Sequence, residues 1–545
     1  MQVGGWFYSF CEASSSWEGF SGRARHGQMQ VSDPSSSKLD VELSQSALLE
    51  VLSQALLEEI FNRLENASAI ASASCVCRSF KEAGRRVRSA RLICLNKYHE
   101  DARAGSGLHD AKAEASTSNA VAAQGAPEGQ QQQAMSIGDD EGSSSGDEYS
   151  FLVFRDVVVD FVREKPHLQQ LRIEIESRLQ SKTVPVPERR RTDFWLSDPF
   201  HLMRWVPSVQ ATLQHLCIVD YGQQAIMRRT SILKILSQNC KVLKTLDLRN
   251  MFIDSSEVED MPRMTSFTLR CVKVIGDTLQ HINARMRNLT TLALLGVFGV
   301  THGNLDFPSM KVLCLGLSTI AKDVSIDIPS LVKLQLKIMC PEKLTINAAS
   351  LKFMAFNLEV KDAAKVEMKN LHNLQEVLYG ASSFATLWSL VATNQMLSKL
   401  FLDIPCMALG EDGKWLGVLK NIPLALPTFK NLLLCQKLAV LNIGPGLWHA
   451  MEVNLEELST VQNWPPFNRL IIHMIPQNLD ACLAILQLLL KPTLNSLEMY
   501  IHINSPVSYE AIVSQVTDIV SYFGQGLVFR PQLWKKSLNF SCFSF

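Results

Sequence analysis

The chain has 545 residues, of which 47% are hydrophobic and 19% are charged. This length is more than one ordinary compact core requires, although an array of repeats need not divide into separate domains. The formal net charge is +0. No overall field therefore attracts nucleic acid or an anionic membrane, and we expect neither as a partner.

The 13 cysteines are scattered along the chain, and several lie in apolar, strand-like contexts. This pattern is typical of reduced, buried thiols and not of a disulfide framework. Cys75 and Cys77 have no further Cys or His at metal-ligand spacing, so we expect no metal site. The first ten residues lack the basic segment and apolar core of a signal peptide, and the longest apolar run, around Cys482–Leu490, is too short to span a bilayer. We therefore expect a protein of the cytoplasm, the nucleus or both.

Residues 1–40 are rich in Ser and Gly without any period, which predicts a disordered N-terminal tail. Residues 41–86 follow as a helical domain. Its first half places apolar residues on one stripe of an α-helix, namely Leu52, Leu56, Leu57, Ile60, Phe61 and Leu64. A polar break leads to a second helical segment with Val76, Cys77 and Phe80. Such a small unit has more apolar surface than it can bury alone, so it requires a partner from the rest of this chain or from another protein.

These residues resemble an F-box. The family pattern reads Leu-Pro-x-Glu-Leu-Leu-x-x-Ile-Phe-x-x-Leu and then Val-Cys-Arg-x-Trp, and the spacing agrees within each half. Ser53 replaces the usual Pro, Ala55 replaces the acidic residue and Phe80 replaces Trp. The loss of Pro removes a preset helix start. The resemblance implies a contact with the Skp adaptor that is formed or supported by Leu52, Leu56, Leu57, Ile60, Phe61, Leu64, Val76, Cys77 and Phe80.

Residues 87–98 alternate small or apolar residues with arginine and predict a first solenoid strand. Residues 99–149 include the run GDDEGSSSGDE and almost no large apolar residues, so we expect a low-complexity, disordered insert. Because a strand precedes the insert, it is either a loop that leaves the first repeat or a plain linker between domains. Both interpretations stay open.

From residue 150 to residue 505 one phrase recurs, in which apolar residues stand at the first, fourth and sixth positions. Its copies are Leu168/Leu171/Ile173, Leu213/Leu216/Ile218, Leu243/Leu246/Leu248, Met264/Phe267/Leu269, Leu289/Leu292/Leu294, Met310/Leu313/Leu315, Leu331/Leu334/Leu336, Leu351/Met354/Phe356, Leu374/Val377/Tyr379, Leu397/Leu400/Leu402, Leu438/Leu441/Ile443, Phe467/Leu470/Ile472 and Leu494/Leu497/Met499. Between residues 243 and 397, successive copies start 20 to 25 residues apart. This is the period of a leucine-rich repeat, with one strand and one return segment per turn.

The gaps between strands hold helical patterns, and we expect helices at Phe151–Val162, Thr230–Gln238, Ser382–Asn394, Leu479–Leu490 and Val507–Tyr522. The familiar repeat has Asn or Cys at its ninth position, whereas this chain has Met251, Val272, Val297, Ser318 and Met339 there. The usual side-chain ladder is therefore missing. Irregular repeats after an F-box resemble the plant F-box/leucine-rich-repeat proteins.

The expected fold class is α/β. We expect an N-terminal helical F-box followed by an irregular leucine-rich-repeat solenoid, with a parallel sheet on the concave side and helices and loops outside. Residues 506–545 are expected to form a C-terminal helix and tail.

We find no phosphate-binding glycine loop, no two-histidine helix motif and no recognisable nucleophile turn, so we expect neither catalysis nor a cofactor. The residues between the apolar positions of each strand face outward on the concave sheet, where they can bind a target protein. The candidates are Arg249, Arg270, Lys333, Lys337, Lys399, Phe401, Asp403 and Tyr500. Phe401 and Tyr500 are expected to be exposed among charged residues and are the strongest candidates for a contact, because aromatic anchors dominate interface energies.

The resemblance favours a substrate-recognition subunit of an SCF-type cullin–RING ubiquitin ligase, with a Skp adaptor, a cullin scaffold and an unknown protein target as partners. The alternative is an adaptor-free scaffold whose helical unit seals the end of the solenoid. Exposure of the stripe Leu56/Ile60/Leu64 favours the first hypothesis, and burial favours the second. A hormone co-receptor is a third hypothesis, but no clustered basic pocket in the sequence supports it.

Overall fold

The computed structural model describes residues 53–95, 154–176, 195–221, 226–275, 277–301, 303–317, 322–339, 341–359, 365–381, 394, 396–403, 437–460, 467–503, 505–522 and 527–534. The expected N-terminal tail, the insert at 99–149 and Leu52 lie outside the described residues, as does the expected helix at Ser382–Asn394 except for its last residue.

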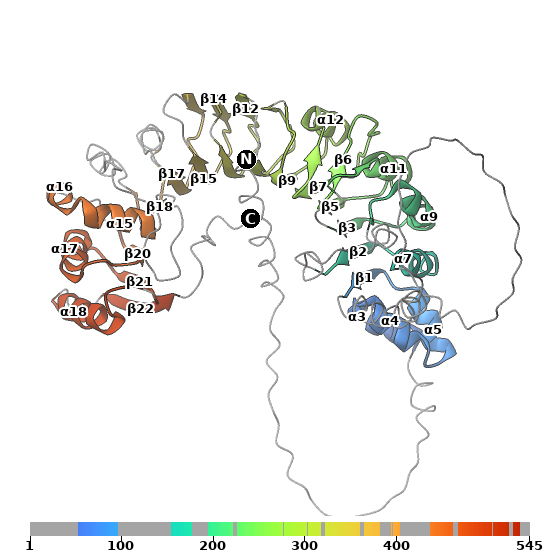
Figure 1. Ribbon diagram of the computed structural model, residues 1–545, viewed down its shortest axis with the longest axis horizontal. Helices are drawn as coiled ribbons and strands as arrows, with labels where there is room; N and C mark the ends of the chain where they lie inside the picture. Colours follow the sequence, from blue (N-terminus) through green and yellow to red (C-terminus); the bar gives the residue numbers. More distant parts are fainter. Residues whose placement is uncertain are drawn as a thin grey trace, which may run out of the picture.

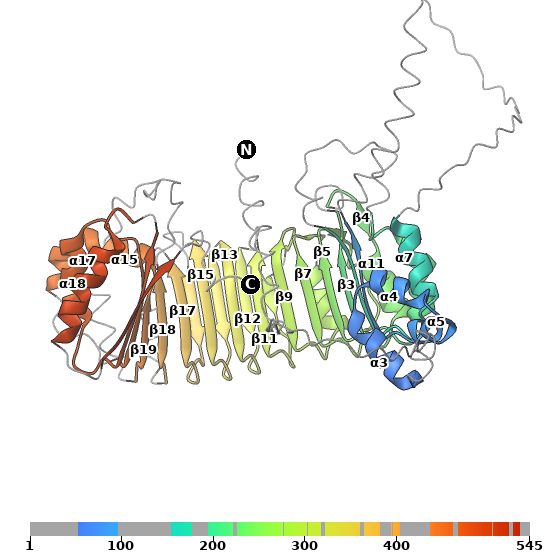
Figure 2. The ribbon, with the colours of Figure 1, turned by 90° about the horizontal axis from the view of Figure 1, so that it is seen from below.

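A curved parallel sheet of 15 strands runs through the described chain, and its strands follow one another in chain order (Figures 1 and 2). They are β1 (Ser89–Cys94), β2 (Gln170–Ile175), β3 (His215–Val219), β5 (Thr245–Arg249), β7 (Ser266–Arg270), β9 (Thr291–Val297), β11 (Val312–Leu317), β13 (Lys333–Met339), β15 (Phe353–Glu359), β17 (Glu376–Ala381), β18 (Lys399–Asp403), β19 (Val440–Ile443), β20 (Arg469–Met474), β21 (Ser496–His502) and β22 (Val528–Trp534). The described strands and helices form an arc with this sheet on its inner side (Figure 1).

The repeated phrase explains the sheet. Each copy lies at one of these strands, and all three of its apolar residues are buried. In β5, for example, Leu246 and Leu248 point into the core, while Thr245, Asp247 and Arg249 are half-buried on the other face. Matching residues of neighbouring strands pair in register, as Leu246 does with Phe267, so one continuous core runs along the arc. The predicted α/β solenoid is confirmed.

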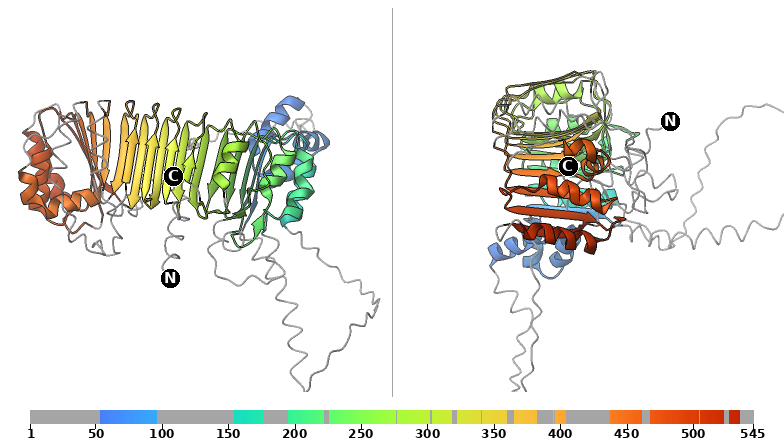
Figure 3. Two further views of the ribbon diagram at one scale, coloured as in Figure 1. Left: turned by 90° about the horizontal axis from the view of Figure 1, so that it is seen from above. Right: turned by 90° about the vertical axis from the view of Figure 1, so that its left-hand side faces the viewer.

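Helices cover the outer side at both ends of the arc (Figures 1 and 3). They are α7 (Phe154–Arg163), α9 (Pro199–Val209), α11 (Ile232–Asn239), α12 (Thr278–Arg285), α15 (Pro445–Val453), α16 (Leu455–Ser459), α17 (Leu479–Leu489) and α18 (Tyr509–Ser521). Of these, α7, α11, α17 and α18 match predicted helices, whereas the other four were not predicted. Two small parallel sheets complete the outer layer: β4 (Arg229–Thr230), β6 (Phe252–Ile253) and β8 (Lys273–Val274), then β10 (Gly303–Leu305), β12 (Asp323–Asp327), β14 (Lys343–Asn347) and β16 (Lys365–Lys369).

In the turns after β5 and β7, backbone hydrogen bonds replace the missing side-chain ladder. Asn250 and Cys271, which follow β5 and β7, have left-handed φ angles of 58° and 52°. Their N–H groups donate to the carbonyl oxygens of the next strands, at 3.0 Å from Asn250 to Arg270 and 2.7 Å from Cys271 to Leu295. Met251 follows directly and is fully buried. The position that holds a polar residue in familiar repeats is therefore part of the core here.

Three helices, α3 (Gln54–Leu64), α4 (Ala67–Ser74) and α5 (Arg78–Arg85), pack beside β1 at the N-terminal end of the sheet (Figure 1). The N–H of Arg91 in β1 donates to the carbonyl oxygen of Glu65 at 2.6 Å. The N–H of Arg88 donates to Oδ1 of Asn62 at 2.8 Å. These bonds join the helical unit to the solenoid.

The sheet continues beyond residue 505, where only a helix and tail were expected. After α18, strand β22 pairs in parallel with β21 from Val528 to Trp534. Its side chains are half-buried or exposed along its whole length, so it closes the sheet as an edge strand. No helix in the described part of the chain is long and apolar enough to cross a membrane.

Candidate interaction surfaces

Helix α3 has two different apolar faces. Leu57 and Phe61 are 1% and 0% exposed and belong to the core. Leu56 and Ile60, one helical turn apart, are 47% and 41% exposed. The helix therefore buries one apolar face in its own domain and presents another to solvent. Leu64 lies between these classes, because it is half-buried and packs against the core.

The second half of the helical unit divides in the same way. Val76, in the turn before α5, is 57% exposed, whereas Cys77 is half-buried. Phe80 is also half-buried and packs against the core. Apart from Leu64 and Cys77, the described residues predicted for adaptor binding therefore form two groups. Leu56, Ile60 and Val76 are available to a partner, while Leu57, Phe61 and Phe80 hold the helices together.

The unusual Ser53 provides a helix start of its own. Its side-chain oxygen accepts a hydrogen bond from the N–H of Leu56 at 3.3 Å and caps α3, which satisfies one of the unpaired amide groups of the first turn. This serine thus takes over part of the role of the missing proline.

Arg86, just after α5, donates a hydrogen bond to Glu58 of α3 at 3.0 Å and connects the two helices.

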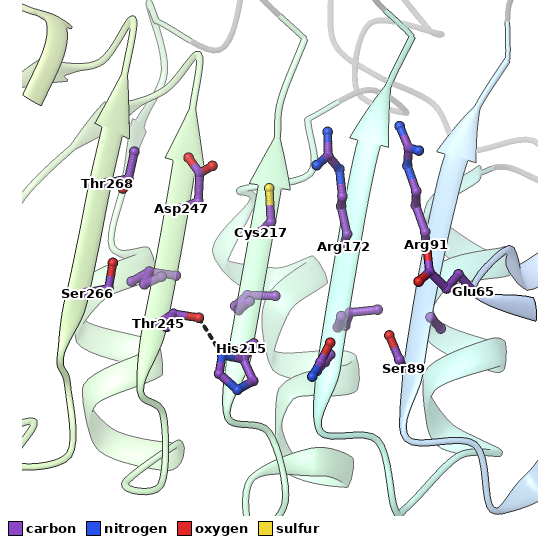
Figure 4. A pocket seen from close by; sticks show the side chains of 15 residues that line it. Glu65, Ser89, Arg91, Arg172, His215, Cys217, Thr245, Asp247, Ser266 and Thr268 are labelled. Carbon is purple, nitrogen blue, oxygen red and sulfur yellow. Dashed lines mark hydrogen bonds between the residues drawn. The ribbon is translucent and has the colours of Figure 1, made fainter. Parts of the chain in front are cut away.

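The concave face has a hollow of about 340 Å³ over β1, β2, β3, β5 and β7 (Figure 4). One row of side chains in it is Arg91, Arg172, Cys217, Asp247 and Thr268, on five successive strands. In the row beside it, Nδ1 of His215 lies 2.7 Å from Oγ1 of Thr245. Polar and charged groups thus dominate this part of the face.

Ion pairs organise the charges at this end of the concave face. Glu174 is 7% exposed, and its two oxygens accept from Nε of Arg91 and Nε of Arg172, each at 2.6 Å. Arg249 donates to Asp247 at 2.8 Å. Arg91, Arg172 and Glu174 were not among the predicted residues, although they alternate with the apolar positions of β1 and β2 in the same way.

The predicted basic residues on the concave face lie in different surroundings. Arg249 and Arg270 occupy paired positions on β5 and β7. Lys333 and Lys337 are half-buried on β13, and Nζ of Lys333 lies 5.0 Å from the ring centroid of Phe353. Lys399 is exposed and lies 3.5 Å from Glu376. The structure brings Arg249 and Arg270 together and places Lys399 several strands away.

Two predicted target contacts are corrected by the structure. Phe401, expected to be exposed, is only 5% exposed and packs with Ala355. Asp403 is 2% exposed and accepts hydrogen bonds from the N–H groups of Gly446 and Leu447, at 3.0 and 3.2 Å. Its carboxylate therefore caps the start of α15. Both side chains serve the packing of the solenoid.

Tyr500 belongs to an aromatic group at the C-terminal end of the arc. Its ring stacks on His473 with centroids 4.6 Å apart, and Trp534 lies edge-on to both His473 and His502. Burial lowers the pKa of His473 to about 4, so this ring is uncharged at neutral pH. Tyr500 is thus half-buried in a stack and is not an isolated anchor. Trp534 was not predicted, because it lies in the unpredicted strand β22. His473 lies on the predicted strand β20 but was not among the predicted contacts.

No group of three or more His, Cys, Asp or Glu side chains in the described residues is placed to hold a metal ion. Comparison with known proteins identifies residues 49–91 as an F-box domain. The chain is also 23% identical over 251 residues to an F-box/LRR-repeat protein of Arabidopsis thaliana. The match covers 46% of this chain and 56% of that relative.

The helical unit, the parallel solenoid and these two matches agree. The chain therefore carries an F-box domain followed by a leucine-rich-repeat-like solenoid, and it is similar to a plant F-box/LRR-repeat protein. The F-box match contains α3, α4, α5 and the start of β1. The matched domain therefore includes the bonds that tie the helices to the sheet, and the F-box and the solenoid share a boundary without a linker between them.

Proposed function

We propose that this protein is a non-catalytic substrate receptor of an SCF-type cullin–RING ubiquitin ligase. The F-box helices would bind a Skp adaptor, and through it the cullin scaffold, while the concave face would hold the target. The protein would act by proximity, because it raises the concentration of target lysines near a ubiquitin-charged enzyme. We propose the cytoplasm or nucleus as its location, because scattered thiols suit a reducing compartment.

The observation that carries the proposal is the pair Leu56 and Ile60, which stay about half exposed on a helix whose other apolar face is buried. A helical cap that only sealed the solenoid would bury these side chains against the repeats. Each apolar side chain of this size contributes roughly 1.5–3 kcal/mol when a partner covers it fully. The exposed pair therefore fits a helix that docks on another protein, as an F-box does.

The test is a pull-down of the full chain with purified Skp adaptor, comparing the wild type with the double variant Leu56→Asp/Ile60→Asp. We expect the double variant to lose adaptor binding. A matched control is Phe200→Asp/Met203→Asp on α9, since these apolar side chains are 85% and 50% exposed but lie outside the F-box. The control should bind like the wild type.

The thermal unfolding temperature of each variant shows whether the solenoid stays folded. If the wild type does not bind the adaptor, the scaffold hypothesis is favoured instead. If the Leu56/Ile60 variant still binds, the adaptor site lies elsewhere on the chain.

A further inference from the structure

Arg270 lacks partners for part of its guanidinium group. The side chain is half-buried, and its Nε and Nη1 atoms are shielded from solvent without a hydrogen-bond partner in the described structure. Burial and the charge of Arg249 lower the pKa of Arg270 below its ordinary value. A buried donor without an acceptor lowers the stability of the fold. The guanidinium group of Arg270 therefore lacks a negatively charged acceptor.

The nearby carboxylates are already occupied. Asp247 accepts from Arg249 at 2.8 Å. Glu174 accepts from Arg91 and Arg172. Asp247 and Glu174, which lie on the strands between β1 and Arg270, are therefore already paired with other arginines. An acceptor for Arg270 must therefore come from another source.

From β7 to β13, none of the described outward positions of the concave face is acidic. The outward positions of β7, β9, β11 and β13 are Ser266, Thr268, Arg270, Thr291, Ala293, Leu295, Val312, Cys314, Gly316, Lys333, Gln335 and Lys337. The small residues Ala293 and Cys314 pair with each other between the basic ones. Burial raises the pKa of Cys314 to about 11, while the charges of Lys333 and Arg270 lower it. An uncharged thiol thus lies within the field of both cations.

We propose that the concave face from β5 to β13 binds an acidic segment of the target protein, with Arg270 as the central anchor and Lys333 as the second cation. This inference rests on the proposed function, because it names the chemistry of the target that the receptor would hold. A carboxylate can accept two parallel hydrogen bonds from a guanidinium group. It would supply the acceptors that Arg270 lacks.

The strand spacing gives the spacing of the acidic residues. From β7 to β13 there are three inter-strand steps, or roughly 14 Å at about 4.8 Å per step. Lys333 lies in the row of Ser266, four residues before Arg270 along the strand direction, so the two contacts are also offset by roughly 13 Å along the strands and lie about 20 Å apart. Because an extended peptide rises about 3.3 Å per residue, about six residues separate the contacts with Arg270 and Lys333. A target segment with acidic residues about six positions apart fits this face.

The test uses the purified full chain and two fluorescent 12-residue peptides, one of alternating Glu and Ser and one of alternating Gln and Ser. Fluorescence anisotropy should show that only the Glu peptide binds, and that binding weakens when the salt concentration rises from about 0.05 M to about 0.5 M. Arg270→Gln and Lys333→Gln should each weaken binding by about tenfold or more, since each removes a charged hydrogen-bonding partner.

The matched control is Lys343→Gln, an exposed lysine on the outer strand β14, which should leave the affinity unchanged. Arg270→Met is a second variant that removes the unpartnered donors without adding a polar group. It should fold with an unchanged or higher unfolding temperature and should also lose peptide binding. Equal binding of both peptides, no binding of either peptide, or wild-type affinity in both Arg270 variants would overturn the proposal.

The same preparations are tested with the Skp adaptor. Arg270→Gln should retain adaptor binding, because Arg270 lies on β7 and not on the F-box helices. Adaptor binding without acidic-peptide binding overturns this inference and leaves the ligase proposal intact. Acidic-peptide binding without adaptor binding supports the basic surface and counts against the ligase proposal.

Discussion

The ring of Phe80 lies edge-on against the ring of Phe61, with centroids 5.7 Å apart and planes at 79°. Phe80 stands where the F-box pattern has Trp, so the substitution keeps an aromatic contact inside the helical unit. Phe61 is fully buried, whereas Leu56, on the same helix, is about half exposed. Helix α3 therefore has one face that stabilises the fold and one face that remains for a partner.

The two faces of α3 predict different effects of truncation. Phe61→Ala should destabilise the helical unit by about 3–5 kcal/mol, because it leaves a cavity in the core. Leu56→Ala should change stability by only about 0.5 kcal/mol. Hydrogen–deuterium exchange over residues 53–85 measures this locally, and it should accelerate in the Phe61 variant alone. If Leu56→Ala accelerates exchange as strongly, Leu56 is part of the core and the scaffold hypothesis gains support.

Asp403 provides a second prediction, in the C-terminal half of the solenoid. Asp403→Ala removes the acceptor for two amide groups at the start of α15, so we expect a loss of about 1–2 kcal/mol in stability. Asp403→Asn keeps one oxygen and should lose less. Gly444→Ala should also destabilise this repeat, because an added Cβ would lie 2.2 Å from the Asp403 side chain. The unfolding temperatures of the three variants measure these effects, and an unchanged value for Asp403→Ala would contradict the capping role.

The repeat period was predictable because each turn of the solenoid must bury the same three positions. A requirement that recurs every 20 to 25 residues leaves a pattern in the sequence, whichever apolar residue fills each position. Strand β22 leaves no such pattern. It lies at the sheet edge, and its residues are half-buried or exposed, with Arg530 and Pro531 in its middle. An edge strand needs few apolar residues, so the sequence there resembles a loop.

The contacts on the concave face were less predictable than the strands. Alternation correctly placed Phe401 and Tyr500 off the main core, but it does not tell how deeply neighbouring side chains cover them. Phe401 is buried beside Ala355, and Tyr500 is stacked on His473. These neighbours come from strands separated by many residues in the sequence. Only the register between strands brings them together.

His201 on α9 predicts loss of stability in acid. Its side chain is fully buried, neither ring nitrogen has a hydrogen-bond partner, and burial lowers its pKa to about 3. The unfolded chain binds a proton near pH 6.5 while the folded chain does not, so this residue makes stability fall as the pH drops below about 6.5. His201→Leu should raise the unfolding temperature relative to the wild type more at pH 5 than at pH 8. The control His372→Leu, at an exposed position, should not, and a His201 variant with the same pH profile as the wild type would contradict the prediction.

Glu452 on α15 predicts the opposite pH dependence. Burial raises its pKa to about 7, against hydrogen bonds from the N–H of Gln477 and Nε1 of Trp448. The folded chain therefore binds this proton more tightly than the unfolded chain, and the contribution of Glu452 to stability increases as the pH falls from about 8 to about 5. Glu452→Gln cannot ionise and keeps one oxygen acceptor, so its unfolding temperature relative to the wild type should be higher at pH 8 than at pH 5. Glu456→Gln, an exposed neighbour on α16, should show no such difference. Equal behaviour of the two variants would mean that Glu452 is solvated and ionises normally.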